Sequence, residues 1–246
     1  MRIDVITLFP ELVSSVIQYG VVSRAADKGL LQLKLWNPRD FTTDLHRTVD
    51  DRPYGGGPGM LMKVEPLQVC IHAVKSENPK ARLVYLSPQG KLLRQDVMNQ
   101  AVEWESLILL CGRYEGIDER LIQQEVDEEW SIGDYVISGG ELAAMVCIDA
   151  ITRQIPGALG DRNSAQQDSF SVGLLDYPQY TRPEVVNGVK VPGVLLNGHH
   201  QMIQDWRDKQ ALGRTWKRRP DLLGQMELTE RQQGLLEEFI AESNLT

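Results

Sequence analysis

Short apolar runs alternate with stretches of helical periodicity over the first two thirds of the chain. Because several of the runs are apolar throughout, the alternation predicts an α/β domain with a mostly parallel sheet flanked by helices on both faces. The predicted strands are Arg2–Phe9, Leu31–Trp36, Arg82–Leu86, Leu107–Cys111 and Tyr135–Ile137. The predicted helices are Glu11–Lys28, Val64–Ser76, Leu92–Glu103, Ile117–Val126 and Glu141–Gln154. A long polar loop is expected over Asn37–Gly59, and loops of this length are usually functional or disordered.

The pattern changes at Pro156. The following residues are rich in Gly, Ser, Asn and Gln, and helical patterns return only at Met202–Trp216 and Thr229–Ser243. The chain is therefore expected to hold an α/β domain over residues 1–160, a flexible linker over 161–172 and a small helical domain over 173–246.

Charge is spread unevenly along the chain. The 246 residues carry a net charge of −8, with a pI of about 5.1, which argues weakly against a nucleic-acid-binding protein. However, acids dominate Glu115–Glu129, whereas Lys and Arg dominate Asp205–Arg219. A local basic patch on an acidic protein can still contact phosphates.

The cysteines and the N-terminus point to a reducing compartment. Cys70, Cys111 and Cys147 are odd in number, widely spaced and placed in apolar stretches, so they are expected to be buried free thiols. None of the histidines has zinc-ligand spacing with a cysteine, and no metal ligands are assigned. Without signal-peptide anatomy or a run of ~18 apolar residues, we expect a cytoplasmic protein with no membrane partner.

Three predicted strands end in turns of small residues. These turns read Y-L-S-P-Q-G at Tyr85–Gly90, C-G-R-Y-E-G at Cys111–Gly116 and I-G-D-Y-V-I-S-G-G-E at Ile132–Glu141. One such turn alone is most often only a turn, but carboxyl ends of parallel strands cluster in space and are where α/β sheets bind ligands. No dinucleotide fingerprint or P-loop accompanies them, so the turns favour a ligand contacted mainly by backbone groups over a nucleoside triphosphate.

The order of these motifs resembles that of a known enzyme family. D-D-R-P-Y-G-G-G-P-G-M, Y-L-S-P-Q-G, C-G-R-Y-E-G-I-D-E-R and S-I-G-D-Y-V-I-S-G-G-E resemble the bacterial tRNA (guanine-N1)-methyltransferases. This family belongs to the SPOUT class of S-adenosylmethionine-dependent enzymes, and the resemblance extends to W-K-R-R-P near the C-terminus. It implies a deep trefoil knot, which general folding rules would not predict. It also implies a homodimer whose active site lies at the subunit interface.

The resemblance further implies which residues bind the methyl donor, S-adenosylmethionine. Each of the three turns would form one wall of the donor site. The implied residues are Tyr85, Leu86, Ser87, Pro88 and Gly90; Gly112, Arg113 and Tyr114; and Ile132, Gly133, Asp134, Tyr135, Val136, Ile137, Gly139 and Gly140.

The implied reaction is methylation of N1 of guanosine 37, just 3′ of the tRNA anticodon, where position 36 is also guanosine. Guanine N1 carries a proton, so a base must remove it while a donor stabilises the charge that builds on O6. The resemblance assigns Asp168 as the base and Arg153 as the O6 partner, and it links Glu115 to catalysis and to a magnesium ion. Judged locally, Asp168 is a solvated loop aspartate and Arg153 complements the dipole at the end of its helix.

Two groups of residues are expected to hold the tRNA anticodon region. By resemblance, His46, Asp50 and Arg52 lie near the target base, and arginine suits guanine edges. The run Lys217, Arg218 and Arg219 suits phosphates, whereas Trp206 and Trp216 are interpreted as core residues.

Two other functions compete with this one. A different knotted methyltransferase could act on a ribose 2′-hydroxyl or on ribosomal RNA, but it would need no O6 partner. A catalytically inert RNA-binding protein could keep the fold, but it would be expected to lack Asp168 or Arg153, and both are present.

Overall fold

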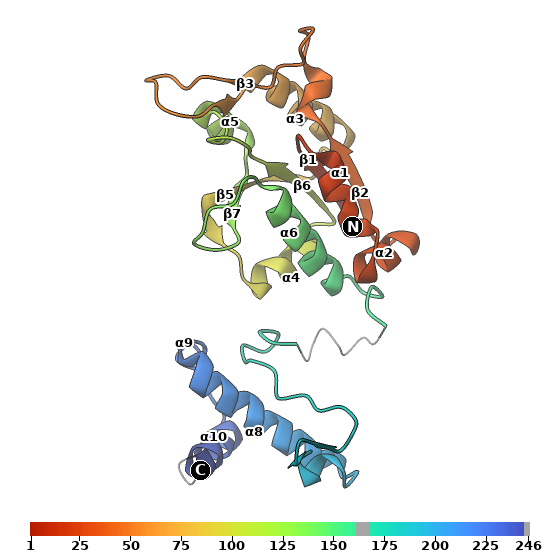
Figure 1. Ribbon diagram of the computed structural model, residues 1–246, viewed down its shortest axis with the longest axis vertical. Helices are drawn as coiled ribbons and strands as arrows, with labels where there is room; N and C mark the ends of the chain where they lie inside the picture. Colours follow the sequence, from red (N-terminus) through yellow and green to blue (C-terminus); the bar gives the residue numbers. More distant parts are fainter. Residues whose placement is uncertain (161–167, 244–246) are drawn as a thin grey trace. The chain divides into compact units, whose positions relative to one another are not determined.

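The computed structural model describes residues 1–160 and 168–243 and divides into two compact units, Met1–Arg162 and Asn163–Thr246. The first unit is a parallel sheet between two layers of helices, as Figure 1 shows. The strand order is β2-β1-β6-β5-β7, and every pairing in this sheet is parallel. The strands are β1 (Arg2–Ile6), β2 (Gln32–Trp36), β5 (Arg82–Leu92), β6 (Ser106–Cys111) and β7 (Glu128–Ser131). The α/β prediction is confirmed.

The helices divide between the two faces of the sheet. One face is covered by α1 (Pro10–Ser14), α2 (Gly20–Asp27), α4 (Gln95–Glu103) and α6 (Glu141–Gln154). The other face is covered by α3 (Val64–Glu77) and α5 (Glu119–Glu125). Shorter elements are the 3₁₀ turns η1 (Ser15–Ile17) and η2 (Pro38–Phe41) and the small antiparallel pair β3 (Asp50–Asp51) and β4 (Leu61–Met62).

The central strand shows why apolar runs form this sheet. In β6, Leu107 and Leu109 pack into the core under α6, while Ile108 and Leu110 pack into the core under α3. All four side chains are fully buried, because successive residues of a strand point to opposite faces and both faces are covered.

The free, buried cysteines were predicted correctly. Cys70, Cys111 and Cys147 form no disulfide, and all three are buried. Burial raises the pKa of Cys70 and of Cys147 to about 12, and it raises the pKa of Cys111 well above its usual range. The thiols therefore act as apolar packing groups.

One predicted strand was wrong. Tyr135–Ile137 is a bend followed by irregular backbone, and the strand that pairs with β5 is β7, whose sequence E-E-W-S has no apolar run. β7 lies at the sheet edge, and only Trp130 and Ser131 of its residues are buried. An edge strand needs few apolar positions, so the surrounding acidic residues concealed it from the hydrophobic pattern.

Several predicted boundaries also moved. The expected helix Glu11–Lys28 is interrupted after Ser14 by η1, and α2 begins at Gly20, whose φ of +73° is a left-handed conformation. The strand predicted as Arg82–Leu86 continues to Leu92 through an irregularity between Leu86 and Lys91, so the first small-residue turn lies within β5. The next helix consequently begins at Gln95 rather than at Leu92.

The second unit is mainly helical, as predicted. Its helices are α8 (His200–Arg218), α9 (Pro220–Leu223) and α10 (Glu230–Ser243), accompanied by η3 (Gly193–Leu195) and a small hairpin of β8 (Val185–Val186) and β9 (Val189–Lys190). The ring of Phe239 on α10 packs against α8 at Gly213, where a Cβ atom would overlap the ring. The core prediction for Trp216 was wrong, because its side chain is 38% exposed; Trp206 is half-buried beside Tyr180.

Part of the predicted linker, residues 161–167, lies outside the described residues. Its described part contains Asp168 and enters a tight turn, in which the Phe170 amide donates to the carbonyl of Leu174 at 2.7 Å. Among the residues that the structure describes, no helix is both long enough and apolar enough to span a membrane.

Candidate functional site

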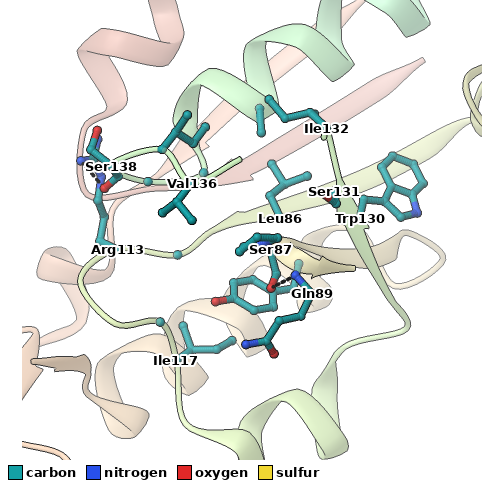
Figure 2. A pocket seen from close by; sticks show the side chains of 18 of the residues that line it. Leu86, Ser87, Gln89, Arg113, Ile117, Trp130, Ser131, Ile132, Val136 and Ser138 are labelled. Atoms are coloured by element: carbon teal, nitrogen blue, oxygen red, sulfur yellow. Dashed lines mark hydrogen bonds between the residues drawn. The ribbon is translucent and has the colours of Figure 1, made fainter. Parts of the chain in front are cut away.

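The three small-residue turns meet around one cavity of about 370 Å³. Figure 2 shows it with Leu86 and Ser87 from β5, Arg113 and Ile117 after β6, and Ile132 and Val136 after β7. The strands from which these segments come are neighbours in the sheet, so parallel pairing brings the segments together. The volume suits a small organic ligand.

Most of the residues predicted to bind the donor line this cavity. Gly90 and Asp134 do not. Gly90 instead lies against the backbone of Glu129 and Trp130, where a Cβ atom would overlap main-chain atoms, and Asp134 is exposed. The cavity also has lining residues that were not predicted: Gln89, Gly116, Ile117, Glu119, Ile122, Trp130, Ser131, Ser138 and Ala143. Several of these residues lie within or next to the quoted motifs. Their position in the motifs was the sequence feature from which they could have been predicted.

Gly140 brings the backbones of two walls into close contact. Its amide donates to the carbonyl of Gly112 at 3.0 Å. A Cβ atom at this position would lie 2.7 Å from Cα of Cys111, a separation that real side chains do not tolerate. Gly140 is therefore needed because two backbone segments approach each other here. Its backbone conformation does not require glycine, since a φ of −72° suits any residue.

Arg113 joins the second wall to the third. Its Nη1 donates to the carbonyl of Ser138 at 2.9 Å, and its guanidinium lies 4.4 Å from the ring centroid of Phe9. Its Nε lies 2.9 Å from Oε2 of Glu141, which is fully buried. Figure 2 shows the Arg113 side chain beside Ser138 at the rim of the cavity.

The pKa values of Tyr85 and Asp118, which lie at or near the cavity, are displaced. Burial and the neighbouring Glu129 carboxylate raise the pKa of Tyr85, so its hydroxyl stays protonated at neutral pH. Hydrogen bonds from Arg120 lower the pKa of Asp118 to about 2. Asp118 also caps α5, whose Glu119 and Ile122 line the cavity. Its charge fixes the start of that helix.

The three residues predicted to be catalytic lie in different places. Glu115 lines the cavity, and its amide donates to the carbonyl of Met60 at 2.9 Å. Arg153 is half-buried in the last turn of α6, within the first unit. Asp168 is exposed and belongs to the second unit.

The residues predicted to bind RNA fall into two groups. Asp50 lies next to the cavity, since the hydroxyl of Tyr114 donates to its Oδ1 at 3.3 Å, whereas His46 and Arg52 are exposed on the early loop. In the second unit, Lys217, Arg218 and Arg219 are exposed at the end of α8. Arg219 forms an ion pair with Asp221 at 2.7 Å, which holds its guanidinium in place.

Residues 1–160 and 168–243 contain no group of three or more His, Cys, Asp or Glu side chains that could hold a metal ion. Glu115 thus lacks the clustered ligands that a magnesium site needs within this described part of the chain.

Comparison with known proteins places the chain. Residues 1–225 match the model of the tRNA (Guanine-1)-methyltransferase TrmD family. The chain belongs to this family. It is 60% identical over 243 residues to the tRNA (guanine-N(1)-)-methyltransferase of Photobacterium profundum, with 98% of each chain covered. It is 63% identical over 242 residues to the enzyme of that name from Halorhodospira halophila, covering 98% of this chain and 92% of the relative.

The match confirms the resemblance stated from the motifs, including membership of the SPOUT class. The tRNA (guanine-N1)-methyltransferases are transferases, and the similarity covers the described part of the first unit, where all three cavity walls lie. A different family of knotted methyltransferases is disfavoured by a match of this length and identity.

We predict that Gly140→Ala opens the cavity walls and destabilises the fold. The added methyl group overlaps Cα of Cys111, and overpacking of this kind costs about 1–3 kcal/mol in the free energy of unfolding. Urea unfolding followed by circular dichroism measures the difference.

Gly234→Ala is the matched control. Gly234 lies in α10, and among the described residues nothing beyond the backbone of its own helix would come within 4 Å of an added Cβ atom. Alanine there is therefore expected to be neutral or to stabilise by up to ~1 kcal/mol. Equal stability of the two variants would contradict the close-packing argument.

Proposed function

We propose that this protein transfers a methyl group from S-adenosylmethionine to N1 of guanosine 37 in tRNAs that carry guanosine at position 36. The observation that carries the proposal is the convergence of the three motif turns on one cavity. Family membership and the names of the relatives support the same activity. A tRNA substrate also agrees with the cytoplasmic location expected from the sequence.

The cavity suits the methyl donor in size and in chemistry. Leu86, Ile132 and Ile137 offer apolar surface for an adenine ring, and the glycine-rich turns expose backbone groups to its polar edges. When bound, S-adenosylmethionine supplies a methyl group made electrophilic by the adjacent sulfonium. Gly112, Gly139 and Gly140 keep the surrounding walls thin, so that the backbone comes close to this ligand.

Two side chains are proposed to act on the guanine. Asp168 accepts the N1 proton as the new bond forms, which frees the lone pair of N1 to attack. Arg153 donates hydrogen bonds to O6 and stabilises the negative charge that builds there. Glu115, which lines the cavity, is proposed to assist this step.

The anticodon loop is proposed to contact both units. Asp50 is anchored beside the cavity by Tyr114, and His46 and Arg52 lie on the same loop, where they can read guanine edges. Lys217, Arg218 and Arg219 are exposed and can contact backbone phosphates.

We predict that purified protein incorporates label from S-adenosylmethionine into a tRNA transcript with guanosine at positions 36 and 37. A transcript with adenosine at position 37 is expected to remain unlabelled, because adenine has an amino group where guanine has O6, and Arg153 can donate hydrogen bonds only to an acceptor. Mapping the methyl group to N1 checks the product. Labelling of both transcripts would contradict the proposed target.

In the same assay at single turnover, we predict that Asp168→Asn slows methyl transfer by at least ~10²-fold, since an amide cannot take the proton. Its affinity for the donor is expected to match the parent protein. Near-normal transfer by this variant would contradict the role of Asp168 as the base. If the parent protein itself binds RNA but transfers no methyl group, the protein is better explained as a catalytically inert RNA-binding protein.

A homodimer is proposed because an apolar face is exposed beside the cavity. Phe9 and Leu12 lie at the start of α1, and Leu142 and Val146 lie on α6, which packs beside α1. These four side chains are 40–52% exposed. Exposed apolar side chains on neighbouring helices are a common feature of interaction sites, and a twofold dimer would cover them with the same residues of a second copy.

We predict that Val146→Glu shifts the protein from dimer to monomer, because it places a charge among these apolar side chains. Light scattering on a sizing column measures the mass. Asp149→Glu, on an exposed position of the same helix, is the control and should leave the mass unchanged. A monomeric parent protein with full activity would overturn the proposal.

A further inference from the structure

We propose that Glu141 and Thr7 are positioning residues that hold Arg113, and with it the third wall of the cavity, in the geometry that binds the donor. Neither residue lines the cavity. The inference rests on the proposed function, since it names the residues that set donor affinity at that same site.

The buried carboxylate of Glu141 needs stabilising partners. It is fully buried at the first residue of α6. Buried carboxylates are rarely tolerated unless they are paired and hydrogen-bonded. The N-terminal end of a helix favours a negative charge, but this effect is small beside the cost of removing a charge from water. The remaining stabilisation must come from the partners of the carboxylate.

The two carboxylate oxygens have different partners. Thr7 donates from Oγ1 to Oε1 at 2.8 Å, and Arg113 approaches Oε2 with Nε at 2.9 Å. Nε and Oε2 are buried, yet they lack hydrogen-bond alignment. The ion pair therefore holds the Arg113 guanidinium close to the Glu141 carboxylate. The directional hydrogen bond from Thr7 fixes the orientation of that carboxylate.

Thr7 is itself held firmly. It follows β1 and is fully buried, and its amide donates to the carbonyl of Trp36 at 2.9 Å. Its Oγ1 also accepts a hydrogen bond from the amide of Phe9 at 2.9 Å. Through this hydroxyl, the end of β1 orients Glu141.

Arg113 connects Glu141 to the third wall of the cavity. It donates to the Ser138 carbonyl, and its side chain fills the space in front of Gly139, where a Cβ atom would overlap it. Both residues belong to the third wall. If the Glu141 carboxylate changes orientation, Arg113 loses the ion pair that fixes its position. The wall formed by residues 138–140 then loses the support of the Arg113 side chain.

The test compares Thr7→Val, which removes the hydroxyl at nearly constant volume, with Thr7→Ser, which keeps it. Calorimetric titration with S-adenosylmethionine, well below the melting temperature, is expected to give a Kd about tenfold higher for Thr7→Val, the order expected for losing a hydrogen bond to a charged group. Thr7→Ser should stay within about twofold of the parent. In the methylation assay, KM for the donor should rise while kcat at saturating donor stays close to the parent value.

Hydrogen exchange of residues 132–140 provides a readout that needs no ligand. Thr7→Val, and Glu141→Gln if it folds, should speed exchange in this segment, whereas Thr7→Ser should not. A lower melting temperature with unchanged Kd and unchanged exchange would mean that Thr7 and Glu141 serve stability alone, and the inference would be overturned. If the parent protein does not bind S-adenosylmethionine, the proposed function fails, and the exchange data still decide whether the pair holds the wall.

Discussion

The close contact between Gly140 and the backbone at Cys111 is the constraint on which the site depends. It places the third turn directly on the second, with the amide of Gly140 donating to the carbonyl of Gly112. Because α6 begins at the next residue, this contact also brings the N-terminus of that helix beside the end of β6. Any side chain at this position would force the two segments apart and enlarge the gap between two walls of the cavity.

The buried charge of Glu141 follows from that placement. The start of α6 lies where Arg113 and Thr7 can both reach the carboxylate, so three segments far apart in the sequence share one polar contact. Such a contact contributes more to specificity of arrangement than to stability, since desolvation offsets much of the attraction. Here it connects the sheet with a wall of the candidate donor site.

The second unit uses its charges differently. On α8, Lys209 forms an ion pair with Glu242, and Asp205 and Asp208 both bind Arg231 of α10. These pairs join the two helices, and because their carboxylates are partly exposed, each contributes little alone. Lys217 and Arg218 lie exposed beyond these pairs, so positive charge gathers at one end of the helix even though the whole chain is acidic.

Local pattern predicted the central part of the fold well and its edge poorly. The fully buried strand β6 and the helix α6 have apolar residues at the spacing of their own structure, so their positions could be predicted from sequence. The position of β7 could not be predicted from sequence, because an edge strand buries few side chains. Its two glutamates are of a type that is also common in loops. The exposed Trp216 shows the same limit, since a large aromatic residue on a helix does not reveal whether another element covers it.

The sequence by itself determined the α/β class, the motifs that identify the family, and most of the residues that surround the cavity. These properties depend on the order and type of neighbouring residues. Only the tertiary structure decided that Gly90 packs against a neighbouring strand and that Thr7, Glu141 and Arg113 form one network. The physical reason is that such contacts join residues far apart in the sequence, 134 positions in the case of Thr7 and Glu141, and these residues come together only once the sheet has formed.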